Sequence, residues 1–73
     1  MNFIERANAY ADCSIYYYNK GNLKLAAKYW NKIYSLPMNS IDRVLVMRKF
    51  TDEQVYAITD RIRFSYYRAV GLM

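Results

Sequence analysis

The chain has 73 residues, of which 55% are hydrophobic, 18% aromatic and 23% charged, and its formal net charge is +5 at pH 7. This length predicts a single domain over residues 1–73, and the composition is too apolar for a disordered tail. Histidine is absent and Cys13 is the one cysteine, which excludes an intramolecular disulfide and metal sites built from clustered His and Cys. With only two glycines, the chain also lacks glycine-rich phosphate loops and dinucleotide fingerprints.

The first predicted helix covers residues 3–19. Asn2 followed by Glu5 three positions later is typical of a capped helix start. Apolar residues then recur at steps of three or four, at Ile4, Ala7, Ala11, Ile15 and Tyr18. Gly21 suits the left-handed residue that ends a helix and Asn22 suits the N-cap of the next one. We therefore expect the first two helices to form a hairpin.

The second predicted helix begins near Leu23 and ends before Pro37. Its apolar stripe consists of Leu23, Ala26, Ala27, Trp30, Ile33 and Tyr34. Trp30 is a candidate interface anchor, but its place on this stripe favours the hairpin core.

A short third helix and a long fourth helix follow. Ser40 is expected to cap the third helix, which ends by Phe50. Its apolar positions are expected at Ile41, Val44 and Leu45, with Met47 as a further candidate. Thr51 and Gln54 have the spacing of a capping box, and the fourth helix then continues to Gly71. The predicted fold class is all-α: an N-terminal helical hairpin, a short helix and a long C-terminal helix.

The usual equipment of an enzyme is missing from the sequence. Glu5 and Asp12 are seven positions apart on a polar face, and Asp52 and Glu53 suit the start of a helix. We expect no catalytic residue, no cofactor and no metal. No early stretch looks like a secretion signal, and the apolar runs are too short to span a bilayer, so a cytoplasmic location without membrane contact is expected.

Positive charge is concentrated in one segment of the chain. No acidic residue lies between Asp12 and Asp42. Four lysines fall there at intervals of four: Lys20, Lys24, Lys28 and Lys32. Like charges at this spacing destabilise a helix by ~0.2–0.5 kcal/mol per pair, so stability alone does not account for them. An anion-binding surface and an ordinary solvated helix face are both consistent with this lysine ladder.

A second basic group lies in the last helix. Acidic residues are close by in the sequence, so pairing within the chain is the first expectation, and an interaction patch of arginine and tyrosine is the alternative. The candidate partner-binding residues are Lys20, Lys24, Lys28, Lys32, Arg61, Arg63, Tyr67 and Arg68.

Two resemblances to known families are visible. Residues 17–37, "YYNKGNLKLAAKYWNKIYSLP", resemble a single tetratricopeptide repeat in their paired aromatics, turn glycine and late proline. This resemblance supports the hairpin and implies no function. No second repeat is visible.

The second resemblance covers most of the chain. Gly21, "AAKYW" (residues 26–30) and the closing "RFSYYRA" (residues 63–69) resemble the PerC-like and ANR-type small transcriptional regulators of enteric bacteria. Arg63 and Tyr66 match the family's arginine and aromatic, whereas Tyr67 stands where the family has cysteine. The connection over residues 37–54 is longer than in ANR proteins. The resemblance implies control of virulence gene expression through DNA or through other regulators such as nucleoid-associated repressors.

These observations predict a small non-enzymatic regulator that works by contacting DNA or a regulatory protein. The alternative is a protein-interaction module from a phage or mobile element that inhibits a host factor. A third class is a homodimer in which exposed tyrosines of two copies pair.

Overall fold

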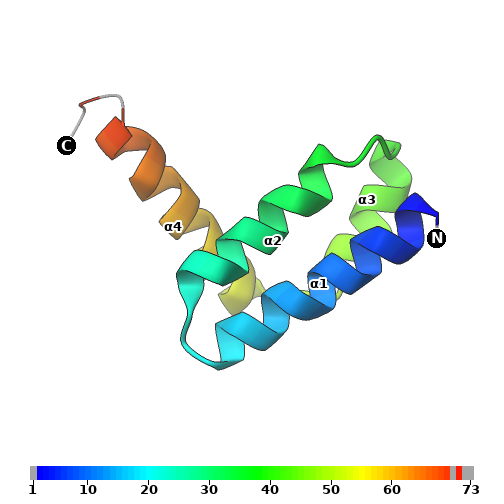
Figure 1. The fold of residues 1–73 in the computed structure, drawn as a ribbon, viewed down its shortest axis with the longest axis horizontal. Coiled ribbons are helices and arrows are strands. Elements are labelled where there is room, and N and C mark those ends of the chain that lie inside the picture. Colours follow the sequence, from blue (N-terminus) through cyan, green and yellow to red (C-terminus); the bar gives the residue numbers. More distant parts are fainter. Residues whose placement is uncertain (1, 70, 72–73) are drawn as a thin grey trace.

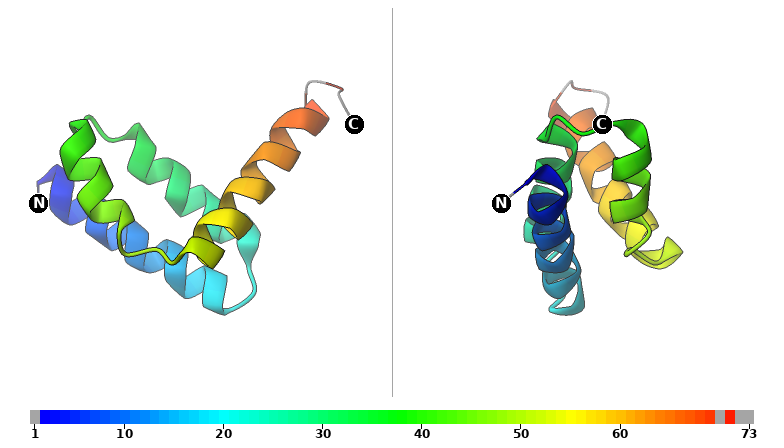
Figure 2. Two further views of the ribbon diagram at one scale, coloured as in Figure 1. Left: turned by 180° about the vertical axis from the view of Figure 1, so that it is seen from behind. Right: turned by 90° about the vertical axis from the view of Figure 1, so that its right-hand side faces the viewer.

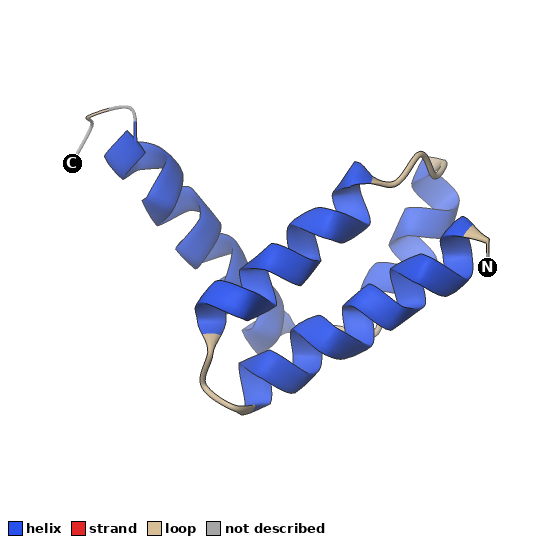
Figure 3. Ribbon diagram, viewed as in Figure 1, coloured by secondary structure: helices blue, strands red, loops and turns tan. Residues whose placement is uncertain are grey.

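The structure is a computed structural model that describes residues 2–69 and 71, with side chains described for residues 2–64 and 71. It contains four helices: α1 (Phe3–Asn19), α2 (Leu23–Ser35), α3 (Ser40–Met47) and α4 (Asp52–Ala69). No strand occurs in the described part of the chain (Figure 3). The predicted all-α fold class is therefore confirmed.

The α1–α2 hairpin is built around the predicted turn. Gly21 adopts a φ of +78°. The side chain of Asn22 accepts a hydrogen bond of 3.1 Å from the backbone N–H of Leu25 and so caps α2. The fully buried Ser14 donates a hydrogen bond of 2.7 Å from its Oγ to the carbonyl oxygen of Ala26, which joins the two helices. Buried alanines on these two helices let the backbones approach closely: Ala7, Ala11 and Ala26.

The other two helices lie on one face of the hairpin (Figure 2, right). Helix α3 packs against α1, and α4 packs mainly against α2. The C-terminal half of α4 extends beyond the hairpin (Figure 1). The radius of gyration, 12.5 Å, accordingly exceeds the value of about 11 Å expected for a compact chain of this length.

Trp30 joins the hairpin to the second layer, which consists of α3, α4 and the turn between them. The residue is 7% exposed, and its ring lies 4.8 Å, edge to face, from the ring of Phe50, which belongs to the turn between α3 and α4. It also contacts Tyr34, with ring centroids 5.9 Å apart. The prediction that Trp30 belongs to the core is confirmed.

Helix α4 begins with the predicted capping box. Thr51 donates its backbone N–H to Oε1 of Gln54 at 2.9 Å, and Oγ1 of Thr51 accepts the N–H of Gln54 at 3.2 Å. The cap predicted for α3 was wrong by one residue. Asn39, not Ser40, accepts the N–H of Asp42 at 2.8 Å, so Ser40 is the first residue of the helix.

Three of the four apolar positions expected in α3 lie on its exposed side. Ile41, Val44 and Leu45 point to solvent with exposures of 73%, 53% and 55%. Val46 is the buried residue of this helix. Because α3 has only two turns and packs on α1 with the side that carries Val46, the side that carries Ile41, Val44 and Leu45 is turned outward. None of the described helices has the length and hydropathy of a membrane span.

A candidate cationic cleft between α2 and α4

An open cleft of about 600 Å³ lies in the angle between α2 and α4. Its apolar lining is formed by Leu25, Ala27 and Ile62. Its polar lining is formed by Lys24, Lys28 and Asn31 of α2 and Arg61 of α4. The cleft therefore combines apolar surface with three cationic side chains.

The helical repeat of α2 and the packing of α4 bring these cations together. Lys24 and Lys28 are one turn apart on α2 and so lie on the same side of the helix. Because α4 packs across α2, Arg61 is brought to the same cleft from a distant part of the sequence. Residues from both predicted basic groups thus share one surface.

The three cations carry uncompensated charge. No acidic residue lines the cleft. The ion pairs between described side chains join Lys49 to Asp12 at 3.1 Å and Arg63 to Asp60 at 3.5 Å. Lys24, Lys28 and Arg61 are exposed and belong to neither pair. The cleft can therefore attract an anionic group without first breaking an internal ion pair.

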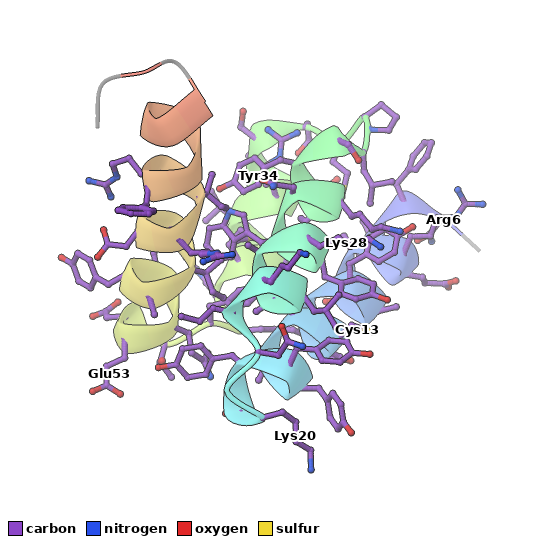
Figure 4. All side chains as sticks on the ribbon, turned by 60° about the vertical axis from the view of Figure 1, so that its left-hand side comes forward. Arg6, Cys13, Lys20, Lys28, Tyr34 and Glu53 are labelled. Atoms are coloured by element: carbon purple, nitrogen blue, oxygen red, sulfur yellow. The ribbon has the colours of Figure 1, made fainter. Side chains whose placement is uncertain are left out.

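The structure divides the lysine ladder. Lys20 follows α1 as its C-cap, with its Nζ 5.5 Å from the ring centroid of Tyr16. The Nζ of Lys32 lies 5.5 Å from the ring centroids of both Tyr10 and Tyr29. Figure 4 shows Lys20 beside the hairpin turn, apart from Lys28 on α2. Only the middle two lysines of the predicted ladder reach the cleft.

The aromatic rings beside Lys20 and Lys32 form a row of four tyrosines that the sequence patterns did not predict. The rings of Tyr17 and Tyr29 stack with centroids 5.8 Å apart. Tyr10 continues the row beyond Tyr29 at 6.2 Å, and Tyr16 contacts Tyr17 at 5.2 Å. A signal was present, because Tyr10 and Tyr17 are seven residues apart and therefore share one side of α1. Cations over ring faces at both ends of the row give it a partly charged surface.

The second predicted basic group does not form one patch. Arg63 and Asp60 are the exposed i,i+3 pair already described, so the expected pairing within the chain is confirmed for Arg63. Arg61 lies two residues earlier and points to a different side of α4. The side chains of Tyr67 and Arg68 lie outside the described residues.

Within the described residues, no three His, Cys, Asp or Glu side chains gather where a metal ion could bind. Comparison of the chain with models of protein families, with curated proteins and with solved structures found no match. Function is therefore inferred from the cleft and the surfaces around it.

Proposed function

We propose that this protein is a small non-enzymatic regulator of gene expression that binds an acidic macromolecule at the α2–α4 cleft. The observation that carries the proposal is the convergence of Lys24, Lys28 and Arg61 with no acidic residue in the lining. Uncompensated like charges cost stability, and they attract an anionic partner strongly at long range. The likeness of residues 21–30 to PerC-like and ANR-type regulators supports the same function.

The phosphate backbone of duplex DNA is the first occupant to consider. Lysine and arginine are the side chains that neutralise DNA phosphates, and the displaced counterions provide much of the binding free energy. The net charge of +5 favours association with the same polyanion. Contacts of this kind position a protein on DNA without reading its sequence.

An acidic surface of a regulatory or host protein is the second candidate. The apolar lining formed by Leu25, Ala27 and Ile62 favours it. Phosphates make no use of that apolar surface, whereas a helix with carboxylates beside apolar side chains uses both parts of the cleft.

The test compares two variants with equal net charge. Lys24→Gln with Lys28→Gln removes two cations from the cleft, and Lys20→Gln with Lys32→Gln removes two from the rest of the ladder. Binding to random duplex DNA is measured at about 50 and 200 mM salt. If all three cleft cations contact phosphates, the wild-type affinity falls by about 40-fold between these salt concentrations, and that of the cleft variant by only about 3-fold to 4-fold. The control variant should keep the wild-type salt dependence.

Equal losses in the two variants would show that net charge, rather than the cleft, holds the DNA. Absence of DNA binding at the lower salt concentration would overturn the DNA contact. The cleft variant and the control would then serve as paired baits for acidic protein partners. A protein retained by the control and lost by the cleft variant would support the second candidate.

A further inference from the structure

The exposed face of α3 is an apolar surface that the fold leaves uncovered. Ile41, Val44 and Leu45, called here the α3 strip, are spaced by three and four residues and so lie on one side of the helix. Their exposures of 73%, 53% and 55% are high for aliphatic side chains of one short helix. The opposite side of α3 packs on α1. No described residue buries the strip, so the surface is available to a partner.

A groove beside the strip adds further apolar surface and fixed positive charge. It is lined by Tyr34 of α2, by Val44 and Met47 of α3, and by Ser40, Arg43 and Arg48. The Arg43 guanidinium lies 5.2 Å from the centre of the Tyr34 ring, and its Nη2 donates a 3.4 Å hydrogen bond to the carbonyl oxygen of Leu36. These contacts hold one cation at the edge of the groove, while Arg48 is exposed.

We infer that the α3 strip and this groove form a docking site for an amphipathic helix of a partner protein. The partner's apolar side chains would cover the strip, and Asp or Glu at the edge of its apolar face would lie opposite Arg43 and Arg48. Amphipathic helices bind apolar grooves through residues spaced as i, i+3, i+4 and i+7. The two arginines determine the specificity of the site, because they attract a helix with acidic edges and repel one with basic edges.

The same charges argue against a second copy of this chain as the occupant. Two copies meeting through α3 would bring together two sets of Arg43 and Arg48, with Asp42 as the one acidic residue of each α3. The strip offers three side chains, or on the order of a few hundred Å², against about 800 Å² per partner in a stable interface. A weak complex with a partner of opposite charge fits this surface better.

The docking site goes beyond the proposed function because it uses no residue of the α2–α4 cleft. The two surfaces lie at different ends of α2: Lys24 and Lys28 are in its first half, whereas Tyr34 is near its end. Figure 4 shows Lys28 and Tyr34 at separate places along this helix. The protein can therefore hold an acidic macromolecule at one end of α2 and a helix at the other. A negative binding experiment at one surface therefore does not affect the test of the other surface.

A displayed library of amphipathic helices tests the inference. Its apolar positions are randomised among Leu, Ile, Val and Phe, and its edge positions between Glu and Lys. The library is selected on the wild-type protein and depleted on the variant Ile41→Gln, Val44→Gln, Leu45→Gln, whose three positions are exposed. Circular dichroism and thermal unfolding confirm that this variant keeps the fold.

We expect the enriched peptides to carry Glu at their edges. A synthesised peptide should lose at least about tenfold in affinity for the strip variant. Arg48→Glu should weaken its binding as well. The cleft variant Lys24→Gln, Lys28→Gln should bind the peptide as the wild type does.

Four outcomes would overturn the inference. The first is a selection that yields no peptide able to distinguish the wild type from the strip variant. The second is enrichment of peptides with Lys at their edges. A third is a concentration-dependent mass of the wild type that the strip variant lacks, which would make a second copy the occupant. The fourth is binding to phosphatidylserine-containing vesicles that is lost in the strip variant, which would make a lipid surface the occupant.

Discussion

Ser14 shows how a single polar side chain can join two helices. It is fully buried between α1 and α2, and its Oγ donates to the carbonyl oxygen of Ala26 at 2.7 Å. We expect Ser14→Ala to lower the free energy of unfolding by about 1 kcal/mol, the net value of one such hydrogen bond. Ser14→Val should cost about 1–3 kcal/mol because the closely packed helices leave no space for a bulkier, branched side chain. Urea unfolding measures both changes.

Ser35 provides the matched control. Its Oγ also donates to a backbone carbonyl, that of Lys32 at 2.8 Å, but the residue is exposed at the end of α2. Ser35→Ala should change the free energy of unfolding by less than about 0.5 kcal/mol. Similar effects at the two serines would contradict a special role for the buried hydrogen bond.

Trp30 is the largest side chain in the contact between the hairpin and the second layer. Its ring contacts those of Phe50 and Tyr34. Trp30→Ala should cost about 3–5 kcal/mol, most of the stability of a domain this small, and we expect loss of the fold. The far-ultraviolet circular dichroism signal and the melting temperature report this loss. Tyr56→Ala, at a residue 70% exposed, is the control. A Trp30→Ala protein with wild-type helicity and melting temperature would remove Trp30 from the core.

At the scale of elements, the turn between α1 and α2 requires glycine for backbone reasons alone. Gly21 has a φ of +78°, and apart from the glycine and its two chain neighbours no atom lies within 4 Å of the position that a Cβ would occupy. Gly21→Ala should therefore cost about 1–2 kcal/mol, the penalty of a left-handed conformation for a residue with a side chain. Gly21→Asn should cost less because asparagine tolerates this region better. Equal stabilities of the three proteins in urea would show that the turn changes its conformation.

The start of each helix was largely predictable because capping is local. The caps at Asn2, Asn22 and Thr51 all satisfy the backbone N–H three residues later, within the same short segment. The orientation of α3 was not predictable. Periodicity identifies an apolar face, but the packing of α1 and the length of the connections decide whether that face is covered.

Only the part of the candidate cleft that depends on local sequence spacing was predictable. The spacing of Lys24 and Lys28 by four residues places them together on any helix. Their grouping with Arg61 depends on how α4 crosses α2, which no local pattern encodes. The separation of Lys20 and Lys32 from the cleft likewise follows from where α1 ends and from the tyrosines beside α2.

At the scale of the molecule, the excess of basic residues lowers the stability of the fold and favours binding of an anionic partner. The chain has 11 basic and 6 acidic residues, and its described part contains two exposed ion pairs. Surface pairs of this kind add little stability. The uncompensated lysines of α2 therefore lower the free energy of unfolding relative to a sequence in which they were neutralised. In the proposed complex, the same lysines contact the acidic partner.

Lys28→Glu tests this conflict directly. The introduced carboxylate would stand four residues from both Lys24 and Lys32, which replaces two repulsive i,i+4 pairs by two attractive ones. We expect the free energy of unfolding at low salt to rise by about 0.8–2 kcal/mol and the affinity for duplex DNA to fall. The neutral variant Lys28→Gln should gain about half as much, and salt at about 0.5 M should reduce both gains because it screens exposed charges. A lower stability of Lys28→Glu at low salt would mean that the aliphatic stem of Lys28 packs on α2 or α4, and that this packing stabilises the fold more than the charge repulsion destabilises it.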